Sequence, residues 1–118
     1  EFLDSHGRVS QVYYPGLSQH PQFQRSAQLF RKPGALFSFE LSQEMEPFDF
    51  LNRLNVVIKS SNLGDNRTLA IPVSQTIYHE MGPARRAEMG IAESLIRISV
   101  GIEEVDDLVE DFSAALES

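Results

Sequence analysis

Two stretches of the chain alternate between apolar and other residues, and each predicts a strand with one buried face. In residues 35–41 every odd position is apolar, with Phe37 and Phe39 at the centre, while the even positions include a Ser and a Glu. In residues 94–100 the even positions from Ile96 onward are all β-branched. Because successive side chains of a strand point to opposite faces, each stretch presents one apolar face to a core.

Apolar residues at helical spacing predict four helices. The clearest follows Gly101, and its apolar stripe consists of Val105, Leu108, Val109, Phe112, Ala115 and Leu116. Shorter helices are expected to begin near Pro21, Pro47 and Pro83, since Pro is tolerated in the first turn of a helix. The first of these has a short apolar stripe, made of Phe23, Ala27 and Phe30. Gly90 is expected to end the helix that begins near Pro83, in a left-handed conformation.

The remaining segments predict short strands and loops. Residues 9–14 and 56–58 are β-prone, residues 60–67 (SSNLGDNR) indicate a loop, and residues 69–81 are extended without a clear period. Strands and helices that alternate across short loops predict an α+β fold. We therefore expect one domain over residues 1–118, an α/β sandwich in which a small, mostly antiparallel sheet has helices packed on one face.

Composition and charge exclude several kinds of partner. The chain has 118 residues, of which 42% are hydrophobic and 23% charged, as in an ordinary globular domain. Its formal net charge is −7, and seven acidic residues and no basic ones lie in residues 103–118. Without a basic patch, neither nucleic acid nor an anionic membrane is expected as a partner. The apolar residues of the acidic segment are periodic, so its acids are predicted to lie on the solvated face of a helix.

The chain lacks most of the motifs that would identify a self-contained active site. It has no Cys, which excludes disulfides, thiolate metal sites and cysteine nucleophiles, and which is compatible with the cytoplasm, the compartment we predict. No apolar run is long enough to span a membrane. The three His have no ligand spacing, so no metal is expected, and neither a serine-hydrolase elbow nor a phosphate-binding loop is present.

Arg97 is the one residue that breaks the pattern of its strand. It lies among apolar residues, where a guanidinium is costly unless it is paired or exposed. One interpretation is an Arg on the open face of the sheet, whose stem covers apolar surface. The other is a two-point clamp for a carboxylate, which the planar fork of Arg binds better than Lys does. The strand pattern alone favours neither.

Four stretches together resemble the Cys/Met-metabolism (trans-sulfuration) enzymes. They are residues 14–21 (YPGLSQHP), 34–41 (GALFSFEL), 62–69 (NLGDNRTL) and 90–112 (GIAESLIRISVGIEEVDDLVEDF). This pyridoxal-phosphate group includes cystathionine γ-synthase, the cystathionine γ- and β-lyases, methionine γ-lyase and the O-acyl-homoserine sulfhydrylases. The resemblance runs from about Val9 to the end of the chain, in the order and at about the spacing seen in the family.

The resemblance covers only the C-terminal, small domain of these fold-type I enzymes. The large domain, which carries the Schiff-base lysine and the phosphate site, is absent, and neither Lys32 nor Lys59 falls in the family's lysine motif. The resemblance thus implies a piece of a larger lyase or transferase that eliminates or replaces groups at the β or γ carbon of cystathionine, methionine or O-acyl-homoserine. The parent would be a homotetramer, and the chain by itself is expected to bind no pyridoxal phosphate and to be inactive.

The resemblance also implies four substrate-binding residues and no catalytic residue in this chain. Arg97 matches the arginine that grips the α-carboxylate of the amino-acid substrate, which favours the clamp interpretation. Asn62 stands where many members have a Ser near that carboxylate, Ser61 falls where subtypes differ, and Thr76 matches a threonine near the substrate. For these three, ordinary loop hydrogen bonding remains an equal alternative.

A second interpretation comes from another class of protein. The chain would then be a free-standing α+β module that binds carboxylates or other proteins without catalysis. The first residue separates the two hypotheses, since an independent small protein is expected to begin with Met and this chain begins with Glu1.

Overall fold

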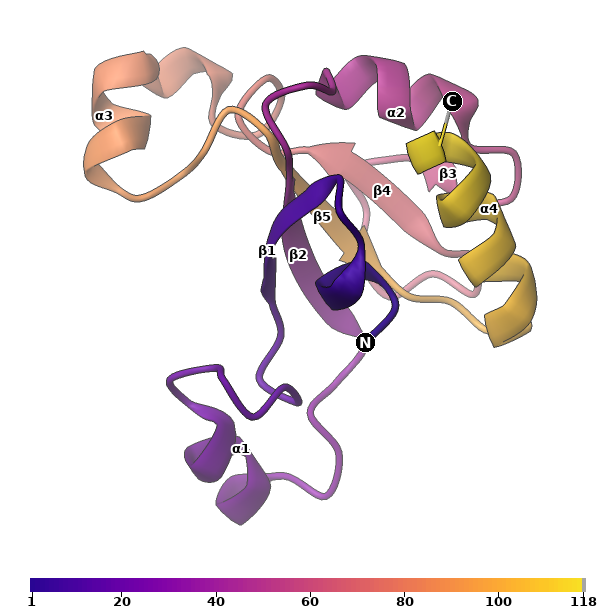
Figure 1. Ribbon diagram of the computed structural model, residues 1–118. Helices are drawn as coiled ribbons and strands as arrows, with labels where there is room; N and C mark the ends of the chain where they lie inside the picture. Colours follow the sequence, from indigo (N-terminus) through magenta and orange to yellow (C-terminus); the bar gives the residue numbers. More distant parts are fainter. Residues whose placement is uncertain (118) are drawn as a thin grey trace.

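The computed structural model describes residues 1–117, and these form one mixed sheet with helices around it (Figure 1). The strands lie in the order β1-β2-β5-β4-β3 and comprise β1 (Val9–Tyr13), β2 (Leu36–Leu41), β5 (Leu95–Ser99), β4 (Leu69–Pro72) and β3 (Ile58–Lys59). All neighbours are antiparallel except β3 and β4. The predicted small, mostly antiparallel sheet is confirmed.

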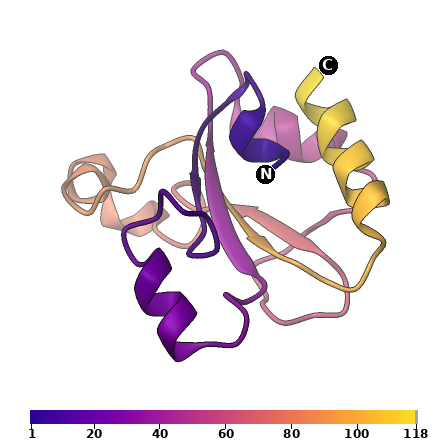
Figure 2. The ribbon, with the colours of Figure 1, turned by 60° about the horizontal axis from the view of Figure 1, so that its bottom comes forward.

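Two of the four helices, α2 (Pro47–Arg53) and α4 (Val105–Glu117), lie together on one side of the sheet, next to the 3-10 turn η1 (Leu3–Ser5) (Figures 1 and 2). The other two, α1 (Phe23–Leu29) and α3 (Pro83–Glu88), extend away from opposite ends of the strands (Figure 1). A second 3-10 turn, η2 (His79–Met81), precedes α3. The α+β prediction is therefore confirmed, whereas the one-sided helix layer consists of α2 and α4 only.

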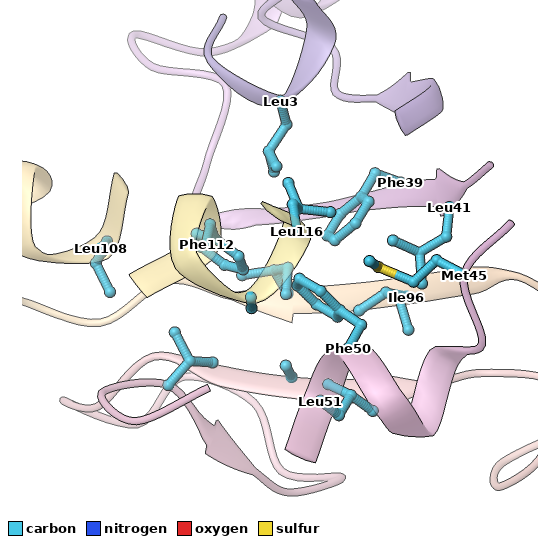
Figure 3. Packing of buried hydrophobic residues seen from close by; sticks show 14 of the residues in the cluster. Leu3, Phe39, Leu41, Met45, Phe50, Leu51, Ile96, Leu108, Phe112 and Leu116 are labelled. Carbon is cyan, nitrogen blue, oxygen red and sulfur yellow. The ribbon is translucent and has the colours of Figure 1, made fainter. Parts of the chain in front are cut away.

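The core lies between the sheet and the layer formed by α2 and α4 (Figure 3). Phe39 of β2 and Ile96 and Ile98 of β5 are fully buried, as the alternating pattern predicts. The rings of Phe50 and Phe112 stack with centroids 6.1 Å apart, and both meet the Phe39 ring edge-on. Three aromatic rings from a strand and two helices thus fix the helix layer on the sheet.

Asp111 corrects the expectation that the acids near the end of the chain lie on a solvated face. It is only 5% exposed, and its carboxylate accepts three backbone N–H bonds, from Asn55 at 2.8 Å, Val56 at 3.0 Å and Val57 at 2.9 Å. These donors belong to the segment after α2 that would otherwise leave its N–H groups unpaired. Asp111 therefore joins α4 to the segment that leads into β3.

Several element boundaries and faces differ from the sequence prediction. The strand expected at residues 56–58 forms at Ile58–Lys59, because the N–H groups of Val56 and Val57 are taken by Asp111. Val105 is 71% exposed, so the buried stripe of α4 begins at Leu108. The apolar stripe of α1 is exposed along its length, because that helix packs on no part of the core. Gly90 adopts the expected left-handed conformation, with φ of 73°.

Within residues 1–117 no helix has the length and apolar character needed to cross a membrane.

Candidate functional site

Arg97 lies on the face of the sheet opposite the helix layer, since its neighbours Ile96 and Ile98 are buried in the core. It is half-buried, between Ser38 of β2 and Ile71 of β4 in the strand register. Its Nη2 donates a hydrogen bond of 2.8 Å to the backbone carbonyl of Ser61. Among residues 1–117 it forms no ion pair with an acidic side chain. No acidic side chain of the described residues thus neutralises the guanidinium.

Ser61 and Asn62 belong to the loop between β3 and β4, which crosses beside Arg97. Both are exposed, and the N–H of Asn62 donates to Oγ of Ser60 at 3.2 Å. The structure therefore brings Ser61 to Arg97 through its carbonyl and places Asn62 next in the chain. Two of the four residues predicted for the site, Arg97 and Ser61, are thereby in contact.

Thr76 is held by its own turn. It is exposed, and its hydroxyl donates to the carbonyl of Pro72 at the end of β4. Within residues 1–117 no hydrogen bond links Thr76 to Arg97, Ser61 or Asn62. Its geometry here is that of local turn stabilisation.

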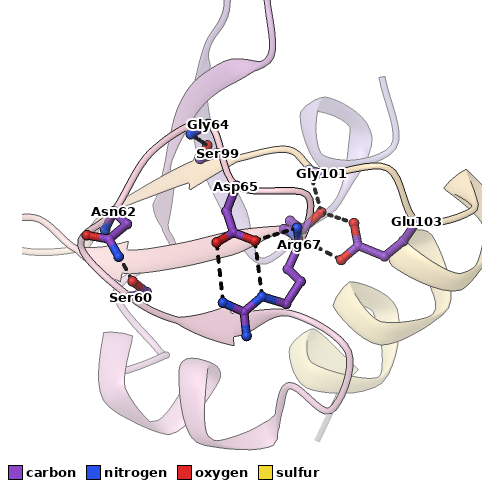
Figure 4. Close-up of polar contacts among 9 residues, drawn as sticks. Ser60, Asn62, Gly64, Asp65, Arg67, Ser99, Gly101 and Glu103 are labelled. Atoms are coloured by element: carbon purple, nitrogen blue, oxygen red, sulfur yellow. Dashed lines mark hydrogen bonds and ion pairs between the residues drawn. The ribbon is translucent and has the colours of Figure 1, made fainter.

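The loop that carries Ser61 is fixed to the connection between β5 and α4 (Figure 4). Glu103 accepts two hydrogen bonds from Thr68, 2.7 Å from its backbone N–H and 2.8 Å from its hydroxyl. The Thr68 hydroxyl in turn accepts the N–H of Gly101 at 2.9 Å. Gly101 is required here, since a Cβ at this position would lie 2.3 Å from the carbonyl oxygen of Asn66. We call Thr68, Gly101 and Glu103 the loop clamp.

Two further contacts shape the same loop. The N–H of Gly64, whose φ is 69°, donates to Oγ of Ser99 at 3.0 Å, so the loop is bonded to the end of the Arg97 strand. Asp65 accepts from the guanidinium of Arg67 at 3.1 and 3.3 Å (Figure 4). These hydrogen bonds hold the pKa of the Asp65 carboxyl below its usual range. The loop is therefore pre-shaped before any ligand binds.

The pKa of Glu103 shows which force dominates at the loop clamp. Burial alone would raise it, but the hydrogen bonds from the backbone and side chain of Thr68 and from its own backbone together outweigh burial, so the pKa is lowered. The sequence predicts Glu103 on a solvated helix face, and it does not predict the loop clamp. The signal available was a Gly directly after a strand with an acid two residues later, a pattern too common to be specific.

A second polar cluster holds the segment between β4 and β5. Arg86 of α3 is only 7% exposed, and its Nε donates to Glu93 at 3.0 Å while its Nη1 donates to the carbonyls of Tyr78 and His79. Glu93 also accepts the hydroxyl of Ser74 at 2.6 Å. The bonds from Ser74 and Arg86 lower the pKa of Glu93. This cluster supports the arm that contains α3.

The described residues do not fit the attachment of pyridoxal phosphate. Lys59 pairs with Ala70, on the core-side row of the sheet, and its Nζ donates to Asn52 of α2 at 2.7 Å, so it lies on the face away from Arg97. Lys32 is exposed in the connection after α1. No cluster of three or more acidic or His side chains in residues 1–117 is placed to hold a metal ion.

Comparison with known proteins identifies a family of enzymes that the chain matches. Residues 1–117 match the family described as "Cys/Met metabolism PLP-dependent enzyme". The chain is 39% identical over 118 residues to cystathionine beta-lyase of Lactococcus lactis, covering 99% of this chain and 31% of that protein. It is 38% identical over 111 residues to O-acetyl-L-homoserine sulfhydrylase 1 of Thermus thermophilus, covering 92% of this chain and 26% of that protein.

Solved structures of the same family also match the chain. The crystal structure of cystathionine gamma-lyase from Lactobacillus plantarum, complexed with L-serine, matches with a TM-score of 0.94 at 34% identity, over 99% of this chain and 31% of that one. The chain belongs to the Cys/Met-metabolism family of pyridoxal-phosphate-dependent enzymes, and the predicted membership is confirmed. It spans between a quarter and a third of the length of these relatives.

Proposed function

We propose that this chain is the C-terminal domain, residues 1–118, of a larger cytoplasmic pyridoxal-phosphate-dependent lyase or transferase of sulfur amino-acid metabolism. Its contribution is the clamp for the α-carboxylate of the amino-acid substrate. The rest of the polypeptide would hold the cofactor, which supplies the electron sink for the elimination or replacement at the β or γ carbon. Family membership and the relatives' greater length support this assignment.

The observation that carries the proposal is the state of Arg97. Its guanidinium has several N–H donors, and the bond to the Ser61 carbonyl uses one of them. A cation that is half-buried and has no acidic partner among residues 1–117 is suited to a carboxylate that arrives with the substrate. Substrate contacts by Asn62, Ser61 and Thr76 are part of the proposal. Ser61 contacts the guanidinium through its carbonyl, and Asn62 is the next residue in the chain, whereas Thr76 would contact the substrate at another point.

Fixing the carboxylate at two points orients the bond at Cα that the reaction breaks. This positioning converts binding energy into rate, because the reacting atoms no longer have to find their geometry by diffusion. The loop clamp contributes by holding the Ser61 carbonyl, which in turn holds one Nη of Arg97. The chain's own residues thus bind and orient, and the covalent chemistry belongs to the remainder of the enzyme.

The test is made in the full-length enzyme that carries this chain. Arg97→Ala should lower kcat/KM by about 2–4 kcal/mol of transition-state binding. Arg97→Lys keeps the charge but loses the two-point fork, so it should also be impaired. Arg85→Ala is the matched control, because Arg85 is exposed on α3 and pairs only with Glu88. Equal activity of the Arg97 variants and the control would refute the clamp.

The isolated chain should neither bind pyridoxal phosphate nor turn over substrate. Mixing the two and dialysing should leave no visible absorption band and no change in melting temperature. A band that survives dialysis and is lost on replacing Lys32 or Lys59 alone would contradict the proposal. Sedimentation of the full-length enzyme tests the homotetramer that we expect by analogy with the family.

A further inference from the structure

Glu40 is the acidic side chain closest in register to Arg97 on the open face of the sheet. It lies on β2 opposite Gln11 of β1 and Leu95 of β5, whereas Ser38, two residues earlier, lies opposite Tyr13 and Arg97. Glu40 is therefore a diagonal neighbour of Tyr13 on one side and of Arg97 on the other. Diagonal cross-strand partners are about 7–8 Å apart at Cα, within reach of long side chains.

The carboxylate of Glu40 is bonded to Tyr13. The Tyr13 hydroxyl donates to Oε1 of Glu40 at 2.5 Å, while Arg97 turns to the Ser61 carbonyl. The hydrogen bond to Glu40, with smaller contributions from burial and from the carboxylate's charge, raises the pKa of Tyr13 to about 12. The phenol therefore stays protonated and remains a donor at any physiological pH.

We propose that Tyr13 holds the Glu40 carboxylate away from Arg97, so that the guanidinium stays free for the carboxylate of the substrate. The inference rests on the proposed function, since it assigns a use to the unpaired charge of Arg97. Tyr13 is a positioning residue in this scheme and touches no reacting atom.

Two donors, the Tyr13 hydroxyl and the Arg97 guanidinium, compete for the one carboxylate of Glu40. Without the Tyr13 hydroxyl, the Glu40 carboxylate loses its donor, and the cationic side chain diagonal to it on that face is the guanidinium of Arg97. In each molecule in which Glu40 pairs with Arg97, the guanidinium is not free for the substrate. The apparent affinity for substrate therefore falls in proportion to the fraction of molecules that remain competent. For a partly exposed ion pair this amounts to about two- to sixfold.

The experiment uses the full-length enzyme and a double-mutant cycle. Tyr13→Phe should raise KM about two- to sixfold with kcat little changed. Glu40→Gln should not raise KM, because no carboxylate is left to compete. The double variant Tyr13→Phe/Glu40→Gln should return KM to the value of Glu40→Gln alone. This rescue distinguishes a positioning role of Tyr13 from a purely structural one, since removing the charge of Glu40 would not repair a fold damaged by Tyr13→Phe.

Tyr14→Phe is the matched control. It removes the hydroxyl of the adjacent tyrosine, which donates to the carbonyl of Gly34 at 2.7 Å and bonds to no acid. Its KM should equal that of the wild type. A crystal structure of the Tyr13→Phe variant should place a Glu40 oxygen within about 4 Å of the Arg97 guanidinium.

The outcomes separate this inference from the proposed function. If the Arg97 variants raise KM but Tyr13→Phe does not, the role of Arg97 in binding the substrate carboxylate is supported and the role of Tyr13 is overturned. If Tyr13→Phe raises KM and Glu40→Gln fails to rescue it, the role of Tyr13 is likewise overturned. If the Arg97 variants leave kcat/KM unchanged, the proposed function itself fails.

Discussion

Alternating residues of the same strands form the two faces of the sheet. One face is buried under helices, and the other carries a charge that is unpaired within the described residues. On the helix side, Ile96 and Ile98 are fully buried against side chains from α2 and α4. On the other side, Arg97 between them meets one backbone carbonyl and no acid among residues 1–117. One face is largely covered by helices of this chain, and the other holds a charge that a ligand can neutralise.

Within the five residues of β5, Ile96 and Ile98 stabilise the fold, whereas Arg97 is available to bind a ligand. Burial of apolar area stabilises the domain whatever the other face contains. A guanidinium held ready and unpaired does little for stability, yet it is the arrangement that recognition of a carboxylate needs. Substitutions on the two faces are therefore expected to affect different measurements.

The largest effect on stability is expected from truncating the aromatic cluster of the core. Phe112→Ala should lower the free energy of unfolding by about 3–5 kcal/mol, because Phe112 is 6% exposed and stacks on Phe50. Phe30→Ala is the control, since Phe30 is 62% exposed and should cost less than about 1 kcal/mol. Denaturant unfolding of the chain measures both. Equal losses of unfolding free energy in the two variants would mean that Phe112 is not part of a packed core.

Removing the charge of Asp111 should rank second. In Asp111→Asn one carboxylate oxygen becomes an NH₂ donor facing backbone donors, so at least one of the three bonds to Asn55, Val56 and Val57 is lost. We expect a loss of about 1.5–3 kcal/mol. Hydrogen exchange should rise at Val56 and Val57 in particular. Unchanged protection there would show that Asp111 does not hold the segment.

The loop clamp should contribute less and should depend on pH. Because the folded-state pKa of Glu103 is lowered, its stabilisation is complete above the ordinary glutamate value of 4.5 and is lost as pH falls through the folded-state value. Glu103→Gln should cost about 1 kcal/mol at neutral pH and flatten this acid-side loss. Glu104→Gln, at an exposed neighbour, should leave neutral-pH stability unchanged. Unfolding curves between pH 3 and 7 test the sign.

The smallest effect on stability is expected at the residue with the largest expected effect on catalysis. Arg97→Ala removes one hydrogen bond to a backbone carbonyl and should change the free energy of unfolding by less than about 1 kcal/mol. The same variant should lose most of its kcat/KM in the full-length enzyme. A loss of stability as large as that of Phe112→Ala would make Arg97 a structural residue and remove the contrast between the faces.

The sequence alone determined the elements with a clear period. The alternation in β2 and β5 and the stripe of α4 from Leu108 onward follow from which side chains avoid water, a property that each residue carries wherever it lies. The same pattern marked Arg97 as exceptional, and motif resemblance selected it, with Asn62, Ser61 and Thr76, as candidates for substrate binding. Local turn chemistry also sufficed for Gly90.

Tertiary structure decided everything that depends on residues far apart in the chain. Asp111 and Glu103 are ordinary acids of a helical segment until Val57 and Thr68 are brought to them, and only then does burial with hydrogen bonds replace solvation. The diagonal placement of Tyr13, Glu40 and Arg97 likewise arises from strand order. The α1 stripe is exposed because that helix packs on no part of the core. Periodicity states which side chains seek a partner, whereas the packing of distant segments decides which partner each one meets.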